Sequence, residues 1–246
     1  MNRSNLNRKL EELLESFDYQ NDNKFKLIAI FGLFGDFDSF EYAINLGKLI
    51  HSKEFENKLD IYAVGIGSKK GKEKFSAFTG LPNKFIKTLQ NNDIHNSLGI
   101  SKGLNSGLGG WINMLLMLSG VNSMGTIKEV IRGYTADKKA YQIYKDTDII
   151  NLFNTFKFSG NLFKKNCGSG YLRPFELATF RLINMIEILN NWDDYILSAD
   201  YLPQRGATFL LDREKNIIYQ YYSNEILSYS KEMSTPLGFI TDTINK

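Results

Sequence analysis

Cysteine is almost absent from this sequence of 246 residues. Cys167 is the only one, so the chain by itself cannot form an intramolecular disulfide, a Cys-x-x-Cys metal knuckle or a dithiol redox pair. Histidine is nearly as scarce: His51 and His95 are isolated in the sequence, and neither has a second ligand at the spacing that zinc sites use. We therefore expect neither a metal nor a cofactor.

Long apolar runs are missing as well. The most apolar segment, residues 111–121, is about half of the roughly 20 residues that a membrane-spanning helix needs, and Asn113 interrupts it. We expect a buried helix there and no membrane span. The first residues, MNRSNLNRKLEELLESFDYQ, contain no apolar stretch and no small-residue cleavage site. The sequence therefore predicts a cytoplasmic protein.

Charge of one sign does not dominate. The chain has 30 Lys and Arg against 27 Asp and Glu, and the two signs are interspersed, so we expect no nucleic-acid partner. What the chain does have is apolar material: 43 % of its residues are hydrophobic and 13 % aromatic, which suits a sizeable core. The sequence leaves the oligomeric state open.

Strand and helix patterns alternate in the first hundred residues. They predict an amphipathic helix over residues 3–18, a polar break at 21–24, a strand over 26–31, a helix over 39–51, a strand over 60–66, a helix over 70–78, a weaker strand over 84–89 and a short helix over 93–98. Two successive strand–helix units imply a right-handed parallel crossover.

The remainder of the chain divides into a middle and an end. Residues 103–202 carry helical patterns and are interpreted as a helical insertion. Its longest helix starts after Arg173 with Pro174 in the first turn, and we expect one apolar face to be buried: Phe175, Ala178, Leu182, Met185, Ile186, Leu189 and Trp192.

The end is predicted to be a hairpin of strands 207–211 and 217–222, followed by a helix over 224–233 with Asn224 as N-cap. The order β-α-β-α, middle, β-β-α is that of a thioredoxin-like α/β fold. The predicted organisation is an N-terminal helix and linker over 1–24, one domain over 25–240 that contains the insertion, and a tail over 241–246.

Three stretches carry a family resemblance: GDFDSFEYA at 35–43, VGIGSKKGKEKFSAFTG at 64–80 and RGATFLLDREKNIIYQYYSNEILSYSKEMSTPLGFI at 205–240. They resemble the AhpC/TSA-like branch called peroxiredoxin-like 2, particularly its cyanobacterial and plastid-type members. The resemblance spans roughly residues 26–240. It implies a thioredoxin-like fold and, in redox-competent relatives, antioxidant activity.

The same resemblance implies a degenerate active site. Relatives carry a Gly-Cys-x-x-Cys-x-Glu-x-Ala type sequence after the first strand. Gly35, Glu41 and Ala43 match it, whereas Asp36 and Ser39 stand at the cysteine positions. Leu33 occupies the place of the Thr or Ser that precedes a peroxidatic cysteine. Peroxide reduction of this kind needs a thiolate with a lowered pKa, which carboxylates and hydroxyls cannot supply.

The candidate site is the polar cluster where the helix over 39–51 begins. Asp38 and Glu41 have the spacing of an acidic capping box, which would satisfy free backbone N–H groups; a divalent metal or a polar ligand is the alternative. In a thioredoxin-like fold the loop before the penultimate strand lies beside this helix, so we expect Arg205 to face Asp36. Such a pair would replace the dithiol structurally or recognise a small polar ligand.

Two other features are weaker. Gly65, Gly67 and Gly71 lie among lysines, but their spacing is not that of a phosphate-binding motif, and a turn followed by a solvated basic helix face is favoured. Cys167 lies in KKNCGSG, where Lys164 and Lys165 would lower its pKa. No base that would orient it for catalysis can be identified in the sequence.

The leading hypothesis is a non-peroxidatic, peroxiredoxin-like protein that binds a protein partner or a small polar ligand at the former redox cleft. That cleft is formed by Asp36, Asp38, Ser39, Glu41 and Arg205. The alternative is an antioxidant or thiol–disulfide oxidoreductase that uses Cys167 with an external thiol. A third class is a metal- or phosphate-binding enzyme at the Asp36 and Gly65 turns.

Overall fold

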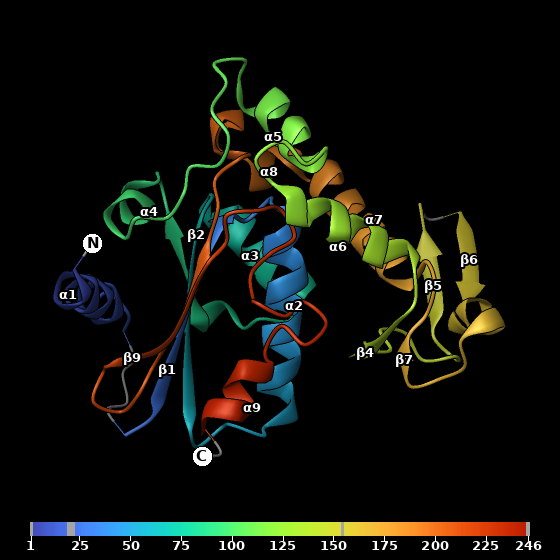
Figure 1. Ribbon diagram of the computed structural model, residues 1–246, viewed down its shortest axis with the longest axis horizontal. Helices are drawn as coiled ribbons and strands as arrows, with labels where there is room; N and C mark the ends of the chain where they lie inside the picture. The colour runs from blue at the N-terminus through green and yellow to red at the C-terminus, as the bar shows by residue number, and fades with distance from the viewer. Residues whose placement is uncertain (1, 19–22, 154, 245–246) are drawn as a thin grey trace.

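The computed structural model describes residues 2–18, 23–153 and 155–244. A mixed sheet of five strands runs through its centre in the order β3-β2-β1-β8-β9; Figure 1 shows helices on either side of it. The first three strands along the chain are parallel to one another. Strand β8 is antiparallel to β1, and β9 is antiparallel to β8. Their bounds are Phe25–Leu33 for β1, Leu59–Ile66 for β2, Ile86–Leu89 for β3, Ala207–Leu211 for β8 and Ile217–Tyr222 for β9.

Helices cover both faces of this sheet, which is why β1, β2 and β8 are apolar on both sides. On one face α1 lays four buried leucines against the sheet, with α4 beside it. On the other face lie α2, α3 and α9 (Figure 1). The bounds are Arg3–Glu15 for α1, Phe37–Ser52 for α2, Lys69–Thr79 for α3, Asp93–Ser97 for α4 and Gly238–Ile244 for α9.

The central connectivity confirms the predicted fold class. β1 and β2 are joined by α2 and lie parallel, and β8 and β9 form a hairpin whose first strand runs antiparallel to β1. This is a thioredoxin-like arrangement with β3 added at one edge. Part of the expected break at 21–24 and the last two residues of the expected tail lie outside the described residues; residues 241–244 belong to α9.

The middle of the chain is not the purely helical insertion that the sequence predicts. It contains α5 (Gly110–Leu118), α6 (Met124–Tyr134), α7 (Glu176–Asn190) and α8 (Trp192–Tyr195), but also β4 (Asp137–Tyr141), β5 (Ile149–Leu152), β6 (Phe156–Ser159) and β7 (Tyr171–Leu172). The four strands have two to five residues and pair as β4-β7 and β5-β6. Strands this short contain too few residues for their alternation to stand out.

Residues 137–172, which contain these strands, are called the accessory lobe below. The lobe projects at the right of Figure 1. In the part of the chain that the structure describes, three 3₁₀ helices complete the fold: η1 (Asn83–Phe85), η2 (Gly160–Asn166) within the lobe, and η3 (Ala199–Tyr201).

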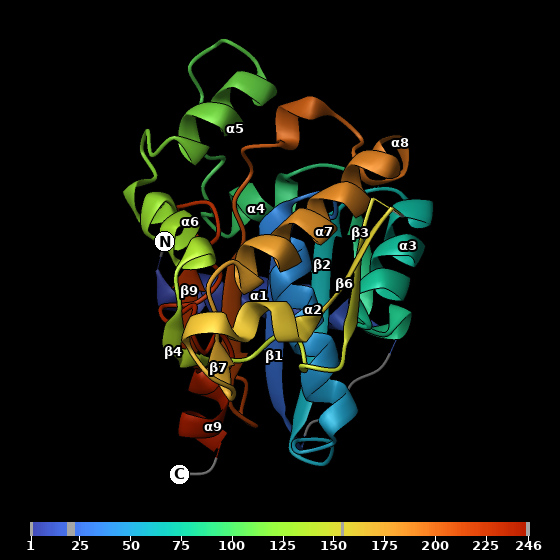
Figure 2. The same ribbon diagram turned by 90° about the vertical axis from the view of Figure 1, so that its right-hand side faces the viewer.

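The buried face of α7 differs from the predicted one. The helix crosses α2 (Figure 2) and packs on α2 and α6. Its buried residues are Glu176, Leu177, Asn184 and Ile188, whereas Phe175 and Leu189 are more than half exposed. The inward stripe contains an acid, Glu176, whose carboxylate accepts the backbone N–H groups of Ile143 and Tyr144, and an amide, Asn184, so apolar periodicity points to the wrong face.

Two further predictions are wrong. Helix α5 buries Met114 and Met117 but exposes Trp111 and Leu115, so it is only half covered. The helix expected at 224–233 does not form, and Asn224 caps nothing; residues 223–237 are irregular and α9 starts at Gly238. Among the described residues, no helix combines the length and apolarity that crossing a membrane requires.

The orientation of α7 predicts a contrast between adjacent residues. Ile188→Ala should lower the free energy of unfolding by about 2–5 kcal/mol, because it empties a fully buried site. Leu189→Ala is the matched control: that side chain is 51 % exposed, so its effect should stay within about 1 kcal/mol. Urea denaturation measures both. Equal losses would mean that α7 is rotated relative to this description.

Candidate functional site

The first turn of α2 begins one residue after Asp36, which is its N-cap. The Asp36 carboxylate accepts the backbone N–H of Asp38 at 3.4 Å and the Ser39 hydroxyl at 3.3 Å. This cap satisfies a free backbone donor and places negative charge at the positive end of the helix dipole. The predicted capping box of Asp38 and Glu41 is therefore wrong, because the helix starts earlier and both side chains have other partners.

Asp38 holds Arg205 in a buried ion pair. Arg205 Nη1 lies 3.0 Å from Asp38 Oδ2, and the side chains are 1 % and 0 % exposed. The same carboxylate oxygen accepts the backbone N–H of Leu227 at 2.6 Å. Arg205 was expected to face Asp36; it is close enough for its charge to act on Asp36, but it pairs directly with Asp38.

The other guanidinium donors of Arg205 satisfy backbone carbonyls. They donate to Pro203 at 2.8 Å, Leu202 at 3.3 Å and Glu225 at 3.4 Å. A buried guanidinium has several N–H donors that need acceptors. Arg205 therefore contacts the loop before β8, the irregular segment after β9 and the start of α2.

Tyr229 completes the cluster and was not foreseen from the sequence. Its hydroxyl lies 3.1 Å from Ser39 Oγ and accepts the backbone N–H of Gly32 at 3.1 Å. Its ring stacks on Tyr42, with centroids 5.3 Å apart. A tyrosine within an irregular segment gives no sequence signal of such a role, because only the path of residues 223–237 brings it to α2.

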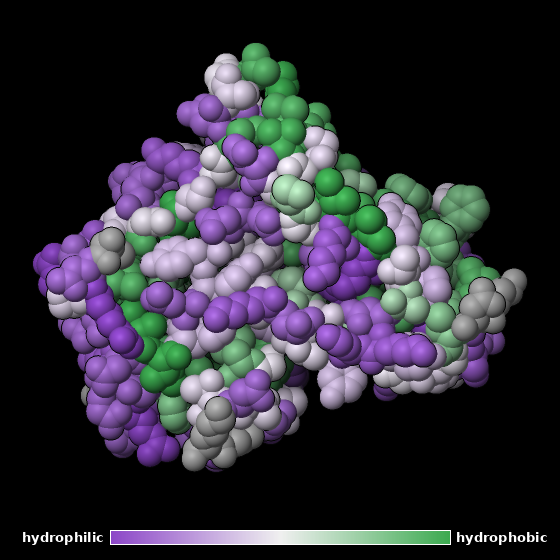
Figure 3. Space-filling view, in the orientation of Figure 1, coloured by the Kyte–Doolittle hydropathy of each residue, from purple (hydrophilic) through white to green (hydrophobic). Residues whose placement is uncertain are grey.

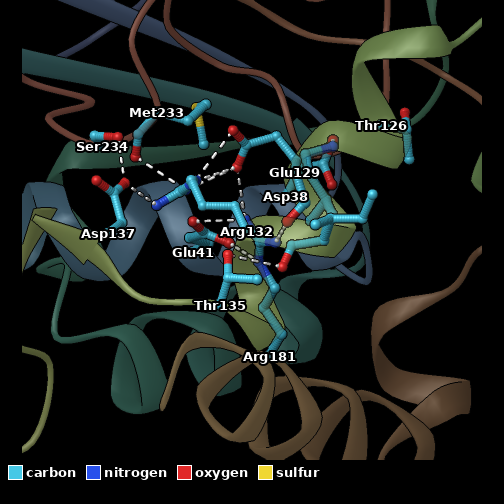
Figure 4. A network of polar contacts seen from close by, with 12 residues as sticks. Asp38, Glu41, Thr126, Glu129, Arg132, Thr135, Asp137, Arg181, Met233 and Ser234 are labelled. Carbon is cyan, nitrogen blue, oxygen red and sulfur yellow. Dashed lines mark hydrogen bonds and ion pairs between the residues drawn. The ribbon is translucent and has the colours of Figure 1, made fainter. Parts of the chain in front are cut away.

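Glu41 belongs to a second network (Figure 4). Its carboxylate accepts two bonds from Arg181 of α7, at 2.6 and 3.1 Å. Arg181 also contacts Glu129 of α6, and Glu129 pairs with Arg132 at 2.7 Å. Arg132 in turn lies 3.3 Å from Asp137, which is at the edge of the accessory lobe. Glu41 was expected from the sequence as a site residue, but none of these partners was. They come from three separate elements.

A model of the AhpC/TSA antioxidant enzyme family matches residues 50–225. The chain belongs to this family. The searches against curated proteins and against solved structures returned no match.

The family match covers β2, α3, the middle of the chain and the hairpin of β8 and β9. It confirms the resemblance expected from the sequence. The first turn of α2 lies before the matched residues, so the substitution of Asp36 and Ser39 for cysteines stays a prediction of the sequence resemblance.

The five candidate residues are buried in this AhpC/TSA family member. Asp36, at 8 %, is the most exposed of Asp36, Asp38, Ser39, Glu41 and Arg205. None of the five lines the cavity of about 350 Å³ that Pro203 and Gln204, the two residues before Arg205, line in part. The described residues contain no group of His, Cys, Asp and Glu side chains that could hold a metal ion.

Two carboxylates share one guanidinium in this cluster, and that imbalance affects their protonation. Burial raises the pKa of Asp36 despite the attraction of Arg205. Burial, followed by the Asp36 charge, raises the pKa of Asp38 to about 8, again against Arg205. Asp38 Oδ1 has no hydrogen-bond partner among the described residues. We infer that the pair retains a proton near neutral pH, as close carboxylates do.

The glycine turn at residues 65–71 is packed against the protein itself. A side chain at Gly65 or Gly67 would collide with the Phe34 ring, so both glycines make room for that ring. Ser68 caps α3 through the Gly71 N–H, and Lys70 and Lys74 pair with Asp194 of α8. The interactions of this turn agree with the structural interpretation rather than with a phosphate loop.

Cys167 follows η2 in the accessory lobe, away from the first turn of α2, and is partly exposed. Lys164, expected to activate it, pairs with Asp146 at 3.2 Å.

The Asp38–Arg205 pair predicts a specific coupling. Arg205→Met should cost about 3–5 kcal/mol of unfolding free energy, because it leaves buried carboxylates without their cation. In a cycle with Asp38→Asn the two losses should be non-additive by about 0.5–3 kcal/mol. The matched cycle uses Asp36→Asn, whose carboxylate has no direct bond to Arg205, and should show the smaller coupling. A larger coupling to Asp36 would contradict this assignment.

The raised pKa of Asp38 predicts a pH dependence. In the unfolded chain the pKa of Asp38 has its ordinary value near 3.8. Between about pH 4 and 8 the folded protein therefore binds more protons than the unfolded chain. The stability that this difference contributes is lost as pH rises through that window. The stability advantage of wild type over Asp38→Asn should therefore shrink from pH 5 to pH 8, by at most about 1.4 kcal/mol per unit. Urea midpoints at both pH values measure it.

The comparison with Asp38→Asn isolates this group. Burial lowers the pKa of His95 to about 4, so His95 makes the folded protein more stable as pH rises towards the ordinary pKa of histidine, which is the opposite trend. This effect is equal in wild type and in Asp38→Asn. The exposed Asp242→Asn serves as a control and should leave the pH profile unchanged. A constant difference between wild type and Asp38→Asn would show that Asp38 is ionised throughout.

Proposed function

We propose that this AhpC/TSA family member has no peroxidase activity and acts by binding a partner or small polar ligand beside the former redox cleft, in the cytoplasm that the sequence predicts. One observation supports the absence of peroxidase activity. Asp36 and Ser39, at the positions that the resemblance gives to the dithiol, are bonded to each other within a buried polar cluster. A thiolate chemistry needs an accessible sulfur there, and these side chains contribute to stability instead.

The burial of the cluster directs the binding proposal to its rim. The cavity of about 350 Å³ reaches the loop before β8, and its size suits a small molecule. Amide and charged side chains line much of it: Asn92, Lys102, Asn105, Asn113, Asp200 and Gln204. These groups offer both donors and acceptors, which favours a polar ligand over a lipid or a hydrocarbon.

A binding role at this place would use the buried cluster as support. Arg205 follows Gln204 in the chain and donates to the carbonyl of Pro203. The Gln204 side chain in turn donates to the carbonyl of Ser101 at 2.8 Å and accepts from Asn92 at 3.2 Å. The rim is thus held by hydrogen bonds on both sides, as a preorganised site requires.

The proposal predicts no turnover of hydrogen peroxide by the purified protein with thioredoxin or glutathione as reductant, because no thiolate lies at the helix N-terminus. Peroxide consumption measures this for wild type and for Cys167→Ser. Turnover that survives in Cys167→Ser would overturn the proposal. Turnover that disappears in Cys167→Ser would establish the alternative, in which the partly exposed Cys167 works with an external thiol.

The binding half is tested on the same protein by native mass spectrometry of gently purified wild type and Asp200→Asn. We expect a bound small molecule on wild type and less of it on the variant. The exposed Asp242→Asn is the matched control and should retain it. Equal occupancy in all three proteins, or none in wild type, would exclude a ligand site in this cavity.

A further inference from the structure

The β5–β6 hairpin of the accessory lobe exposes large apolar side chains. Phe156 is 70 % exposed, Ile149 67 % and Phe153 58 %. Leu162 of η2, which follows the hairpin, is also more than half exposed. Exposed aliphatic and aromatic residues gathered on one small element mark an interaction site.

The base of this hairpin is anchored while its end is not. Ile150 is buried and pairs in register with Phe158, and Phe158 packs edge-on against Phe163 of η2, with centroids 5.7 Å apart. Side chains alternate between the faces of a strand, so Leu152 and Phe156, which pair two residues further along, lie on the same face nearer the tip. Figure 3 shows hydrophobic surface at this end of the molecule.

The accessory lobe is also basic. Residues 137–172 contain six lysines and three aspartates, and the three aspartates are occupied internally. Asp137 pairs with Arg132, Asp146 with Arg173 and Lys164, and Asp148 accepts the Lys145 backbone N–H.

Four lysines of the lobe are exposed and form no ion pair among the described residues: Lys138, Lys139, Lys145 and Lys157. The net positive charge of the lobe, three lysines in excess, equals that of the whole chain. The lobe that carries the apolar hairpin thus complements an anionic partner.

We propose that the hairpin docks the protein on an anionic lipid surface. Phe153 and Phe156 would enter the boundary between headgroups and acyl chains, while Lys157 and the other exposed lysines contact lipid phosphates. The alkyl stems of lysine suit this arrangement, because they can lie along apolar surface while the ammonium group stays in water. Only side chains enter, so the hairpin backbone keeps its hydrogen bonds.

The chemistry favours lipid over two other anionic or apolar partners. Single-stranded nucleic acid is held by aromatic stacking, to which the exposed Ile149 and Leu162 contribute nothing. A protein partner needs about 800 Å² on each side, more than a hairpin of two four-residue strands offers by itself. Attachment to a membrane surface scales with the apolar area buried plus the attraction to anionic lipids, and the hairpin and the basic lobe offer both.

The test is co-sedimentation of the full chain with vesicles of phosphatidylserine and phosphatidylcholine, and with vesicles of phosphatidylcholine alone. We expect at least about tenfold tighter binding to the first, weakening as salt increases. The double variant Phe153→Asn, Phe156→Gln should lose about tenfold or more in affinity. Asparagine is chosen because Phe153 has a positive φ of 56°, which asparagine tolerates.

Matched controls distinguish binding by the hairpin from nonspecific binding through other exposed apolar or basic side chains. Ile131→Asn with Tyr134→Gln removes similarly exposed apolar groups on α6 and should leave binding unchanged. Lys157→Gln should weaken binding to phosphatidylserine vesicles by roughly fivefold, whereas Lys69→Gln, an exposed lysine on α3, should not. Circular dichroism melting verifies that each variant is folded.

Several results would overturn the proposal. Equal binding to both vesicle types, or binding that the hairpin variant leaves unchanged, excludes docking of the hairpin on anionic lipid. Light scattering that shows a wild-type dimer broken by the hairpin variant would make the hairpin an interface between copies of this chain. Hairpin-dependent binding of a single-stranded oligonucleotide, with no vesicle binding, would assign the surface to nucleic acid.

Discussion

The burial of the Arg205 guanidinium is the constraint around which the centre of this structure is organised. A cation removed from water needs an anion and acceptors for its N–H groups. The pair of Asp36 and Asp38 supplies the negative charge, with Asp38 in direct contact, and the carbonyls of Leu202, Pro203 and Glu225 accept the remaining hydrogen bonds. Three segments that are far apart in the sequence must therefore meet at one point. The irregular path of residues 223–237 follows from this requirement, because the Leu227 N–H bonds to the same carboxylate.

A second set of charges extends this organisation to the rest of the molecule. Glu41, one turn further along α2, binds Arg181, and through Glu129 and Arg132 the contacts reach Asp137 at the start of the accessory lobe (Figure 4). Helix α2 thus carries both networks on its first turns. The family match and the thioredoxin-like sheet describe the scaffold. What the protein does depends on the site built on it, and here the start of α2 is occupied by charges that hold the fold together.

Binding is then expected at surfaces outside this buried centre. The polar cavity beside Gln204 and the apolar, basic hairpin of the accessory lobe lie in parts of the chain that connect the two halves of the sheet. Segments of this kind tolerate variation because the central sheet does not depend on them, and they commonly carry function. The two surfaces differ in chemistry, so a small polar ligand and an anionic lipid surface would not compete for the same residues.

The sequence by itself determined the elements whose apolar patterns are regular: α1, the strands and helices from β1 to α4, and the hairpin of β8 and β9. Helix α1 buries one apolar stripe, and β1, β2 and β8 are short continuous apolar runs buried on both faces; the sequence reports both patterns directly. It also led us to expect Asp36, Asp38, Ser39, Glu41 and Arg205 around one cleft, whereas Glu41 lies in a second network. Only the tertiary structure decided which carboxylate pairs with Arg205, that Tyr229 joins them, and that Arg181 of α7 binds Glu41. These choices depend on where distant segments meet, and buried polar contacts leave no periodic pattern in the sequence.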